Sequence, residues 1–378
     1  MTNIENLSSK NLSGILPHKY IEAMLKQQEI KAISAIEEGQ IQPASIDLRL
    51  GDYAYPLDTS FLPGKNFTAL DKLKTLDSNF DKFKIDLRSG AVLEKGRIYL
   101  IPLQESLALP VDISGFANPK SSTGRLDILT RLIADNASVF DQIEPSYKGN
   151  LYIEVAPRSF SVVVKTGDRL NQLRFRKGNI ALPGKEQWHD LIDNLHIVSE
   201  KQSPEDIATL KFTVDLQGDA TPGTIIGYRA KRHAGRIDLE RRDYISSDFW
   251  HPIIYNNKES LILEPEEFYI LMTKEAVAIP PGYAAEMLAY DTRAGEFRVH
   301  YAGFFDPGFG WDLQNNRAGN SRAVLEVRSH DVAFLLEHGQ TVGRLRYEKM
   351  LEVPQILYGQ DIKSNYQGQS LKLAKQFL

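Results

Sequence analysis

Two glutamates, Glu154 and Glu326, occupy the same place in two copies of one pattern, GNLYIEVAPRSFSVVVKTGDRLNQLRF and SRAVLEVRSHDVAFLLEHGQTVGRLRYE. Each glutamate lies 13 residues before a glycine, Gly167 or Gly339, and 21 before an aromatic residue. Matched spacing over such a length predicts two homologous units. A carboxylate at the same place in both units is a candidate general base or acid, because a positioned carboxyl group can move protons to and from a reacting group.

A second group of residues that could do chemistry lies in the segment PKSSTGRLD, which contains Lys120, Ser121, Ser122 and Arg125. Hydroxyl groups, backbone N–H groups and an arginine fork donate hydrogen bonds to phosphate oxygens, so this segment is a candidate anion-binding loop. A plain surface loop has the same Ser/Thr/Gly composition, and for the segment taken alone that is the better explanation.

An acidic residue also begins a turn upstream of each glutamate, Glu144 in EPSYKG and Asp306 in DPGFGW. The turns precede Glu154 and Glu326 by 10 and 20 residues. Neither turn needs a functional explanation, and a single glutamate on a strand is more often solvent-facing than catalytic. The duplication favours a functional role, although duplicated scaffolds can also keep a structural ion pair.

Composition excludes several kinds of protein. The chain of 378 residues has no cysteine, which removes disulfides, thiolate metal ligands and the cysteine ligands of zinc-dependent base deaminases. No histidine spacing fits a zinc site, and neither GxxxxGK[ST] nor GxSxG occurs. A net charge of −4 indicates no general affinity for nucleic acid or anionic membranes. No apolar run could span a bilayer and no secretion signal begins the chain, so the cytoplasm is expected.

After residue 41, short stretches rich in Val, Ile, Leu and Tyr alternate as half-buried strands do, broken by Gly, Pro, Asp and Asn. They predict an all-β fold of two tandem barrels, preceded by short helices over 17–30 and 31–39. We place the first repeat at 1–198 and the second repeat, with a C-terminal tail, at 199–378. The segment GRIDLERRDYISSDFWHPI is expected to be the second repeat's version of SIDLRLGDYAYPLD.

Taken in order, these segments resemble the dCTP deaminases, relatives of the trimeric dUTPases. The resemblance is carried by QPASIDLRLG, SSTGRLD, the acidic-Pro turns, the strand glutamates, GDRLNQL and a tail containing YQGQ, and it covers nearly the whole chain as two copies. It implies a dUTPase-like distorted β-barrel (β-clip) in each repeat and trimers with active sites between subunits. It also implies hydrolysis of dCTP to dUTP and ammonia without zinc.

The resemblance further implies roles for particular residues. Glu154 or Glu326 matches the general base that activates water for attack at C4, and burial would raise its pKa toward the useful range. Glu144 or Asp306 matches the acidic residue beside the sugar. The other substrate-binding positions implied are Lys120, Ser121, Ser122, Arg125, Arg293, Tyr358, Tyr366, Gln367 and Gln369. Magnesium is expected to arrive with the triphosphate, and no protein-held metal is expected.

The two copies depart from the family pattern in different ways. The second copy has Tyr290-Asp291-Thr292-Arg293 instead of paired serines, and the first copy lacks its own tail. Gln142 and Phe304 stand where the single-domain enzymes of this family carry an arginine. We therefore predict one live site per chain, formed by the serine loop, Glu154 and the C-terminal tail, with Glu326 as the alternative base.

Two other interpretations stay open on the sequence. One is cleavage of the triphosphate as well, which would give dUMP; the other is a nucleotide-binding scaffold without catalysis. The expected partners are a deoxynucleoside triphosphate and further copies of the chain. A homo-oligomer is expected, with a trimer as the arrangement that the resemblance implies, and neither nucleic acid nor membrane is expected.

Overall fold

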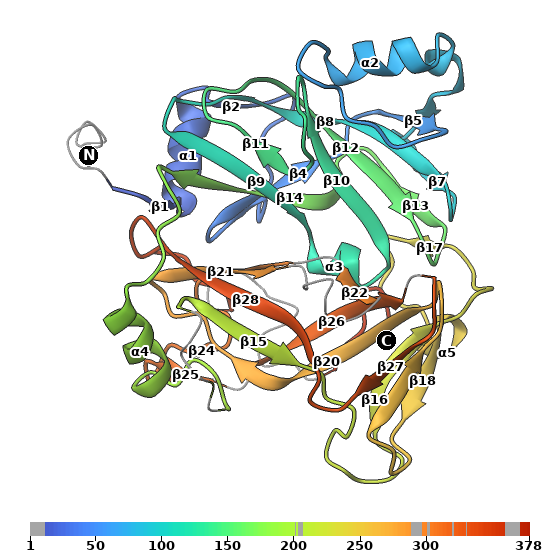
Figure 1. Cartoon of the computed structure of the whole chain (residues 1–378). Coiled ribbons are helices and arrows are strands. Elements are labelled where there is room, and N and C mark those ends of the chain that lie inside the picture. The colour runs from blue at the N-terminus through green and yellow to red at the C-terminus, as the bar shows by residue number, and fades with distance from the viewer. Residues whose placement is uncertain are drawn as a thin grey trace.

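A computed structural model of the chain describes residues 12–200, 202, 207–288, 297–300, 303–319, 321–329, 331–359 and 371–378. Within this part of the chain strands predominate, and the helices are short. Figure 1 shows two β domains, the first repeat above and the second below, with α3 (Ser121–Gly124) at the boundary between them. The predicted all-β fold of two domains is confirmed.

The first repeat consists of two sheets that pack face to face, with strand orders β11-β9-β14-β4-β3 and β10-β12-β8-β5-β6. Alternate residues of these strands, among them Leu48, Ile101, Ile153 and Leu173, fill the space between the sheets. Apart from α3, the elements of the first repeat, including the strands of both sheets, are β1 (Gly14–Ile15), α1 (His18–Lys26), β2 (Ile30–Ala32), β3 (Ile41–Gln42), β4 (Ser45–Arg49), β5 (Tyr53–Leu57), α2 (Ala69–Leu76), a 3-10 turn (Phe80–Phe83), β6 (Ile85–Asp86), β7 (Ala91–Leu93), β8 (Ile98–Ala108), β9 (Ile113–Pro119), β10 (Ile128–Ala134), β11 (Gln142–Ile143), β12 (Lys148–Pro157), β13 (Val162–Val164) and β14 (Arg169–Lys177).

The second repeat has the same plan, with strand orders β23-β21-β28-β15 and β22-β26-β20-β16-β18. It therefore places β26 where the first repeat has β12, and β28 where the first has β14. Its elements are α4 (Lys185–Asp193), β15 (Thr209–Thr213), β16 (Ile225–Ala230), β17 (Ile237–Asp238), α5 (Ser246–Phe249), β18 (Trp250–Ile254), β19 (Ser260–Leu263), β20 (Phe268–Val277), β21 (Tyr283–Leu288), β22 (Phe297–His300), β23 (Phe304–Phe305), β24 (Trp311–Asp312), β25 (Arg317–Ala318), β26 (Ser321–Ser329), β27 (Phe334–Glu337) and β28 (Thr341–Lys349).

The two strand glutamates are equivalent in register as well as in sequence. Glu154 on β12 is the cross-strand partner of Arg131 on β10. Glu326 on β26 is the cross-strand partner of His300 on β22. On their other sides the two strands pair with β8 and β20, which occupy the same place in their sheets. The two repeats inferred from residue spacing therefore also share the same pattern of strand pairing.

Only one of the two N-terminal helices that the sequence predicts is present. Helix α1 lies within 17–30, but the predicted helix over 31–39 is wrong, because residues 30–32 form β2 on the edge of β8. The buried guanidinium of Arg49 donates hydrogen bonds to the carbonyl oxygens of Ser34 and Ala35 at 3.0 and 2.7 Å. These carbonyls are then held by a side chain instead of by helical N–H groups.

The second repeat's counterpart of SIDLRLGD is also not the segment that the sequence suggests. Strand β15 pairs with β28 as β4 pairs with β14, so TLKFTVDLQGD, from Thr209, holds that place. The segment GRIDL instead supplies β17, which pairs in parallel with β13 of the first repeat. The prediction for this segment, which rested on its local similarity to SIDLRLGDYAYPLD, is therefore wrong: the segment forms a strand contact between the two repeats.

The two repeats pack closely against each other. The side chain of Arg176 forms a salt bridge with Glu348 at 2.8 Å, and the ring of Phe116 meets Phe304 edge-on at 5.2 Å. In the connection between the repeats, the buried Trp188 of α4 belongs to the core of the second repeat. The boundary at 198/199 stays a prediction.

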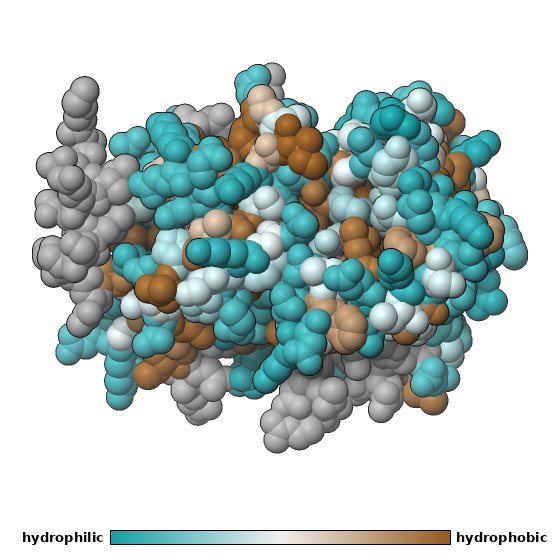
Figure 2. Space-filling model, turned by 90° about the horizontal axis from the view of Figure 1, so that it is seen from above, coloured by the Kyte–Doolittle hydropathy of each residue, from teal (hydrophilic) through white to brown (hydrophobic). Residues whose placement is uncertain are grey.

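Figure 2 shows one face of the molecule, and its surface is typical of a globular protein. This face is mainly hydrophilic, and its hydrophobic residues form small separate groups. No helix among the described residues has the length and apolar character that crossing a membrane requires.

Candidate active site between the repeats

The serine loop predicted to bind an anion follows β9 and includes the short helix α3. It is fixed to the first repeat by Leu170, whose carbonyl oxygen accepts hydrogen bonds from the Lys120 N–H at 3.0 Å and the Thr123 hydroxyl at 2.8 Å. Ser121 is exposed and Ser122 half-buried, while Arg125 is buried. The loop therefore leaves its two serines accessible and turns its arginine into the boundary between the repeats.

Arg125 reaches a carboxylate of the second repeat. Its Nε lies 3.8 Å from Glu326 Oε1, and both side chains are at most 5% exposed. Along β26, Leu325 and Val327 point into the core of the second repeat, so Glu326 points the other way, toward the first repeat. Its carboxyl group is thus enclosed by the loop of one repeat and the sheet of the other.

Burial raises the pKa of Glu326 from its ordinary range to about 8, and the Arg125 guanidinium opposes part of that rise. A carboxyl group with such a pKa can give or take a proton near neutral pH. It is therefore suited to general acid–base chemistry in a way that an exposed surface glutamate is not.

Glu154 has a different environment from Glu326. Its carboxylate lies 3.1 Å from Nε of Arg131, its cross-strand partner, and is 1% exposed. On the same face of the sheet, Tyr152 belongs to a separate apolar cluster that includes Ala69 and Leu73 of α2. Nearby, burial raises the pKa of Asp141 to about 7, although the Arg131 charge lowers it. The serine loop therefore meets Glu326, and not Glu154 as the sequence analysis had grouped them.

The two acidic turn residues are also placed differently. Asp306 is buried at the boundary, where its carboxylate lies 2.7 Å from Nη2 of Arg174 on β14. Burial raises the pKa of Asp306, and the charge of Arg174 opposes the rise. Glu144, its counterpart in the first repeat, is exposed in a turn. Tyr358 of the tail packs on the turn that follows Asp306, with its ring 5.7 Å from that of Phe309.

A basic pocket of about 570 Å³ lies beside the serine loop, which contributes Lys120, Ser122 and Thr123 to its wall. Its other cationic side chains come from the turn before β14 and the first residue of β14, from the second repeat and from the C-terminal segment. They are Lys165, Arg169, Arg242 and Lys375. Burial lowers the pKa of Lys375, and the neighbouring charges of Arg242 and Lys120 lower it further. Three carboxylates, Glu37, Asp168 and Glu240, also line the pocket, so the five cations leave an excess of positive charge that suits a polyanionic ligand.

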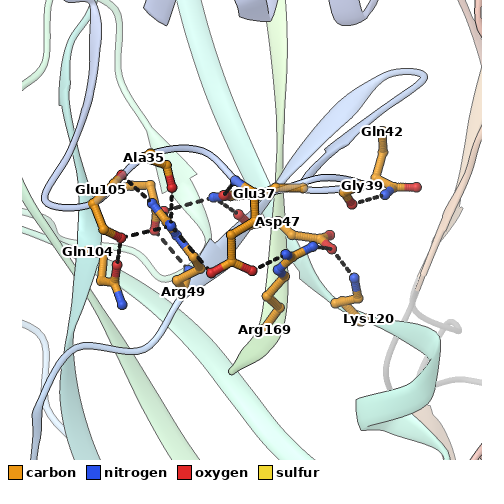
Figure 3. Close-up of polar contacts among 12 residues, drawn as sticks. Ala35, Glu37, Gly39, Gln42, Asp47, Arg49, Gln104, Glu105, Lys120 and Arg169 are labelled. Atoms are coloured by element: carbon orange, nitrogen blue, oxygen red, sulfur yellow. Dashed lines mark hydrogen bonds and ion pairs between the residues drawn. The ribbon is translucent and has the colours of Figure 1, made fainter. Parts of the chain in front are cut away.

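Carboxylates, the buried Asp47 and the exposed Glu37, hold the cations on one wall of the pocket in place. Lys120 forms an ion pair with Asp47, and Arg169 forms one with Glu37, as Figure 3 shows. Behind them Arg49 pairs with Glu105 at 2.8 Å, with both side chains almost fully buried. This network orients Lys120 and Arg169 before any ligand arrives, which reduces the ordering cost of binding.

The remaining sequence predictions concern residues outside those described. Arg293, Tyr366, Gln367 and Gln369 all lie there. In the described part of the chain, no group of three or more acidic or histidine side chains could hold a metal ion.

The sequence patterns did not indicate four of the pocket residues, Lys165, Arg169, Arg242 and Lys375. Arg169 lies inside the GDRLNQL motif, which was used for the family resemblance but not for its charge. The other three lie in segments whose polar composition fits an ordinary surface. Nothing in their local sequence signals that the chain folds them into one pocket.

Comparisons with known proteins agree with this arrangement. Residues 12–179 match the family model of the 2'-deoxycytidine 5'-triphosphate deaminase N-terminal domain, and residues 184–377 match the model of its C-terminal domain. The chain belongs to the dCTP deaminase family. Its members are hydrolases that act on a cytosine nucleotide, and the protein is an enzyme of this class.

A solved structure and shorter relatives extend the comparison. The crystal structure of 2'-deoxycytidine 5'-triphosphate deaminase from Agrobacterium tumefaciens is 47% identical, with a TM-score of 0.83 over 91% of this chain and 100% of that chain. Proteins named dCTP deaminase, dUMP-forming, from Methanosphaera stadtmanae and Persephonella marina are 27% and 28% identical. Each match covers 43% of this chain and 78% or 83% of the relative, so these relatives correspond to about one repeat.

Proposed function

We propose that the enzyme deaminates dCTP at the boundary between its repeats, with Glu326 as the general base. The observation that carries the proposal is the meeting of the serine loop and Arg125 of one repeat with the buried Glu326 of the other. Glu326 takes a proton from water as the oxygen attacks C4 of the cytosine ring. Protons then return to N3 and to the amine, which leaves as ammonia as the C4 carbonyl forms.

The basic pocket supports a triphosphate as the other end of the substrate. Its cations can neutralise several phosphate oxygens, and Ser122 and Thr123 connect the pocket to the loop that carries Arg125. The expected sugar contact of Asp306 is kept in the proposal, since Asp306 lies at the same boundary. Glu144 does not enter the proposed site, because it is exposed in the turn of the first repeat.

Magnesium enters the proposal as the ion carried by the triphosphate. Asp168 and Glu240 line the basic pocket, and carboxylates are the oxygen ligands that magnesium accepts, so the residues present fit a hydrated ion. Zinc is not proposed to take part, because the proton transfers are assigned to Glu326 and the chain has no cysteine.

We propose dUTP and ammonia as the products. The chain has no glycine-rich RGxxGFGSTG segment of the kind that dUTPases carry. A second candidate is release of dUMP, which the names of the Methanosphaera and Persephonella relatives favour. The enzyme is proposed to act in the cytoplasm as a homo-oligomer, with a trimer as the first arrangement to test by light scattering.

Chromatography of nucleotides after incubation with dCTP and magnesium tests the proposal. Formation of dUTP supports deamination alone, and formation of dUMP with pyrophosphate supports the second candidate. Incubation with dUTP in place of dCTP is the control, because a separate dUTPase activity would cleave it. If dCTP binds and is not converted, the proposed site is not catalytic.

A further inference from the structure

Two ion pairs of opposite polarity cross the boundary between the repeats side by side. The end of the serine loop presents Arg125 and, two residues later, Asp127. Strand β26 presents Glu326 and, two residues later, Arg328. Arg125 lies against Glu326, and Asp127 forms an ion pair with Arg328. The charges thus run positive then negative on the loop, and negative then positive on the strand.

The second pair is buried and supported by further hydrogen bonds. The Asp127 and Arg328 side chains are 1% and 4% exposed. The hydroxyl of Ser159 donates a hydrogen bond to Asp127 at 2.6 Å and lies 3.4 Å from Arg328. Arg328 also donates to the carbonyl oxygen of Glu266. Buried charges persist only when they are paired and hydrogen-bonded, so this arrangement is a built contact.

The backbone at Asp127 has a left-handed conformation, with φ of 55°. Glycine adopts this conformation most easily, and Asp is among the few other residues that tolerate it. Its carbonyl oxygen accepts a hydrogen bond from the Arg158 N–H at 2.9 Å, which holds the turn. The backbone alone would be satisfied by glycine, so the carboxylate at this position has a separate explanation, namely its pairing with Arg328.

The first repeat has no equivalent of Arg328. Two residues after Glu154 stands Ala156, where two residues after Glu326 stands Arg328. Strand β12 therefore cannot offer Asp127 the partner that β26 offers. On each strand, the residue two positions after the glutamate lies on the same face as the glutamate. This residue is Arg328 beside Glu326 and Ala156 beside Glu154, so only the strand of Glu326 can form the ion pair with Asp127.

We propose that Asp127 and Arg328 are positioning residues, which dock the serine loop on β26 and so hold Arg125 at Glu326. This inference rests on the proposed role of Glu326 and explains how the site is assembled. A shift of the loop by two residues would place Asp127 beside Glu326, and like charges brought together oppose docking. The two pairs together therefore define one register between loop and strand.

A double-mutant cycle with Asp127→Asn and Arg328→Gln tests the proposal. Asn tolerates the left-handed backbone, so the first change removes only the charge. Each single variant is expected to lower kcat for dCTP about tenfold with a smaller change in KM, and the double variant to be no worse than the poorer single one. Losses that multiply in the double variant would overturn the proposal.

The pH profile separates positioning from a general structural role. If Arg125 moves away from Glu326, the carboxylate loses a stabilising charge, so the acid limb of kcat/KM should move to higher pH. Loss of activity with an unchanged profile would contradict the proposal. Arg322→Gln is the matched control, because Arg322 lies on the same strand and pairs with Asp215 within the second repeat at 2.6 Å. It should leave both kcat and the profile unchanged.

A milder variant covers the case in which Arg328→Gln does not fold. Ser159→Ala removes the hydroxyl that contacts both members of the pair, and it should give a smaller loss of kcat with the same direction of pH shift. Wild-type behaviour of this variant would also overturn the proposal. A fully active Glu326→Gln enzyme would instead refute the proposed function, whereas an inactive one with a multiplicative cycle refutes only the positioning role.

Discussion

The guanidinium of Arg125 and the carboxylate of Glu326 lie 3.8 Å apart across the boundary between the two repeats of one chain. The family resemblance implies active sites between subunits, and here two units of that kind are joined in a single polypeptide. The loop comes from the first repeat and the glutamate from the second. The loop and the glutamate of one candidate site therefore come from different repeats, which gives the following predictions.

Substitution of the two glutamates should have unequal effects. Glu326→Gln removes the proposed base and should lower kcat at least about a hundredfold, a typical contribution of general acid–base catalysis. Glu154→Gln should retain most of the activity, because Glu154 pairs with Arg131 within the first repeat and the serine loop meets Glu326 instead. Steady-state kinetics with dCTP measures both. The opposite order of effects would place the base in the first repeat.

The activity should depend on pH through Glu326. Because the pKa of Glu326 is raised to about 8, the carboxylate form is a minority at pH 7, and kcat/KM should rise with pH up to about 8. A profile already flat between pH 6 and pH 9 would argue against Glu326 as the base.

Stability gives an independent check of the same pKa. The folded state binds a proton at Glu326 that the unfolded state, with an ordinary glutamate pKa, releases at lower pH. This contribution is therefore lost as pH rises toward the folded value. Gln imitates the protonated acid, so the Tm of Glu326→Gln relative to wild type should increase between pH 6 and pH 9. An equal difference at both pH values would mean that the carboxyl group has an ordinary pKa.

The basic pocket should act on substrate binding more than on the chemical step. Lys375→Gln should raise KM for dCTP about tenfold and leave kcat within about threefold, since charge-assisted contacts to phosphate contribute to binding. Arg242→Gln should do the same, whereas Arg241→Gln is the control, because Arg241 pairs with the exposed Asp243 at 2.9 Å. Inorganic tripolyphosphate should compete with dCTP in the wild type. Equal KM values for the Arg242 and Arg241 variants would exclude the pocket as the phosphate site.

The glutamates and the serine loop could be found from sequence because their signals are local. The spacing of Glu154 and Glu326 within strands, and the composition of the loop around Ser122, need no knowledge of tertiary contacts. The partner of the loop could not be found in this way. Which glutamate the loop meets depends on the residue beside that glutamate on its strand, which is Arg328 in the second repeat and Ala156 in the first. In the first repeat, residues of the segment 58–84 also pack with Tyr152 of β12.

The pocket and the N-terminal region were missed for similar physical reasons. Lys375 comes from a polar tail that resembles an ordinary extension, and it reaches the pocket because the neighbouring Phe377 packs against Trp250 with ring centroids 6.0 Å apart. The expected helix over 31–39 does not form. The carbonyl groups of Ser34 and Ala35 instead accept hydrogen bonds from Arg49, which is distant in sequence. In both cases a tertiary contact overrides local preference.

The Arg131–Glu154 pair should matter for stability and not for turnover. Arg131→Met leaves the buried Glu154 carboxylate without its partly exposed partner and should cost about 1–3 kcal/mol of unfolding free energy, as an unsatisfied buried polar group does. Adding Glu154→Leu should recover much of this loss, because a buried ion pair can be replaced by apolar side chains. Urea unfolding measures both variants. A large fall in kcat for the folded double variant would show that the first repeat takes part in catalysis.

The final prediction concerns the number of sites. Glu154 on β12 pairs with Arg131 of its own repeat, while the equivalent Glu326 on β26 receives the serine loop, so the chain should bind one dCTP and not two. Calorimetry with the Glu326→Gln variant, which should bind dCTP with little turnover, measures the stoichiometry directly. Lys375→Gln in the same background should weaken this one binding event, and Arg241→Gln should not. Two equivalent nucleotides per chain would mean that the first repeat keeps a working site of its own.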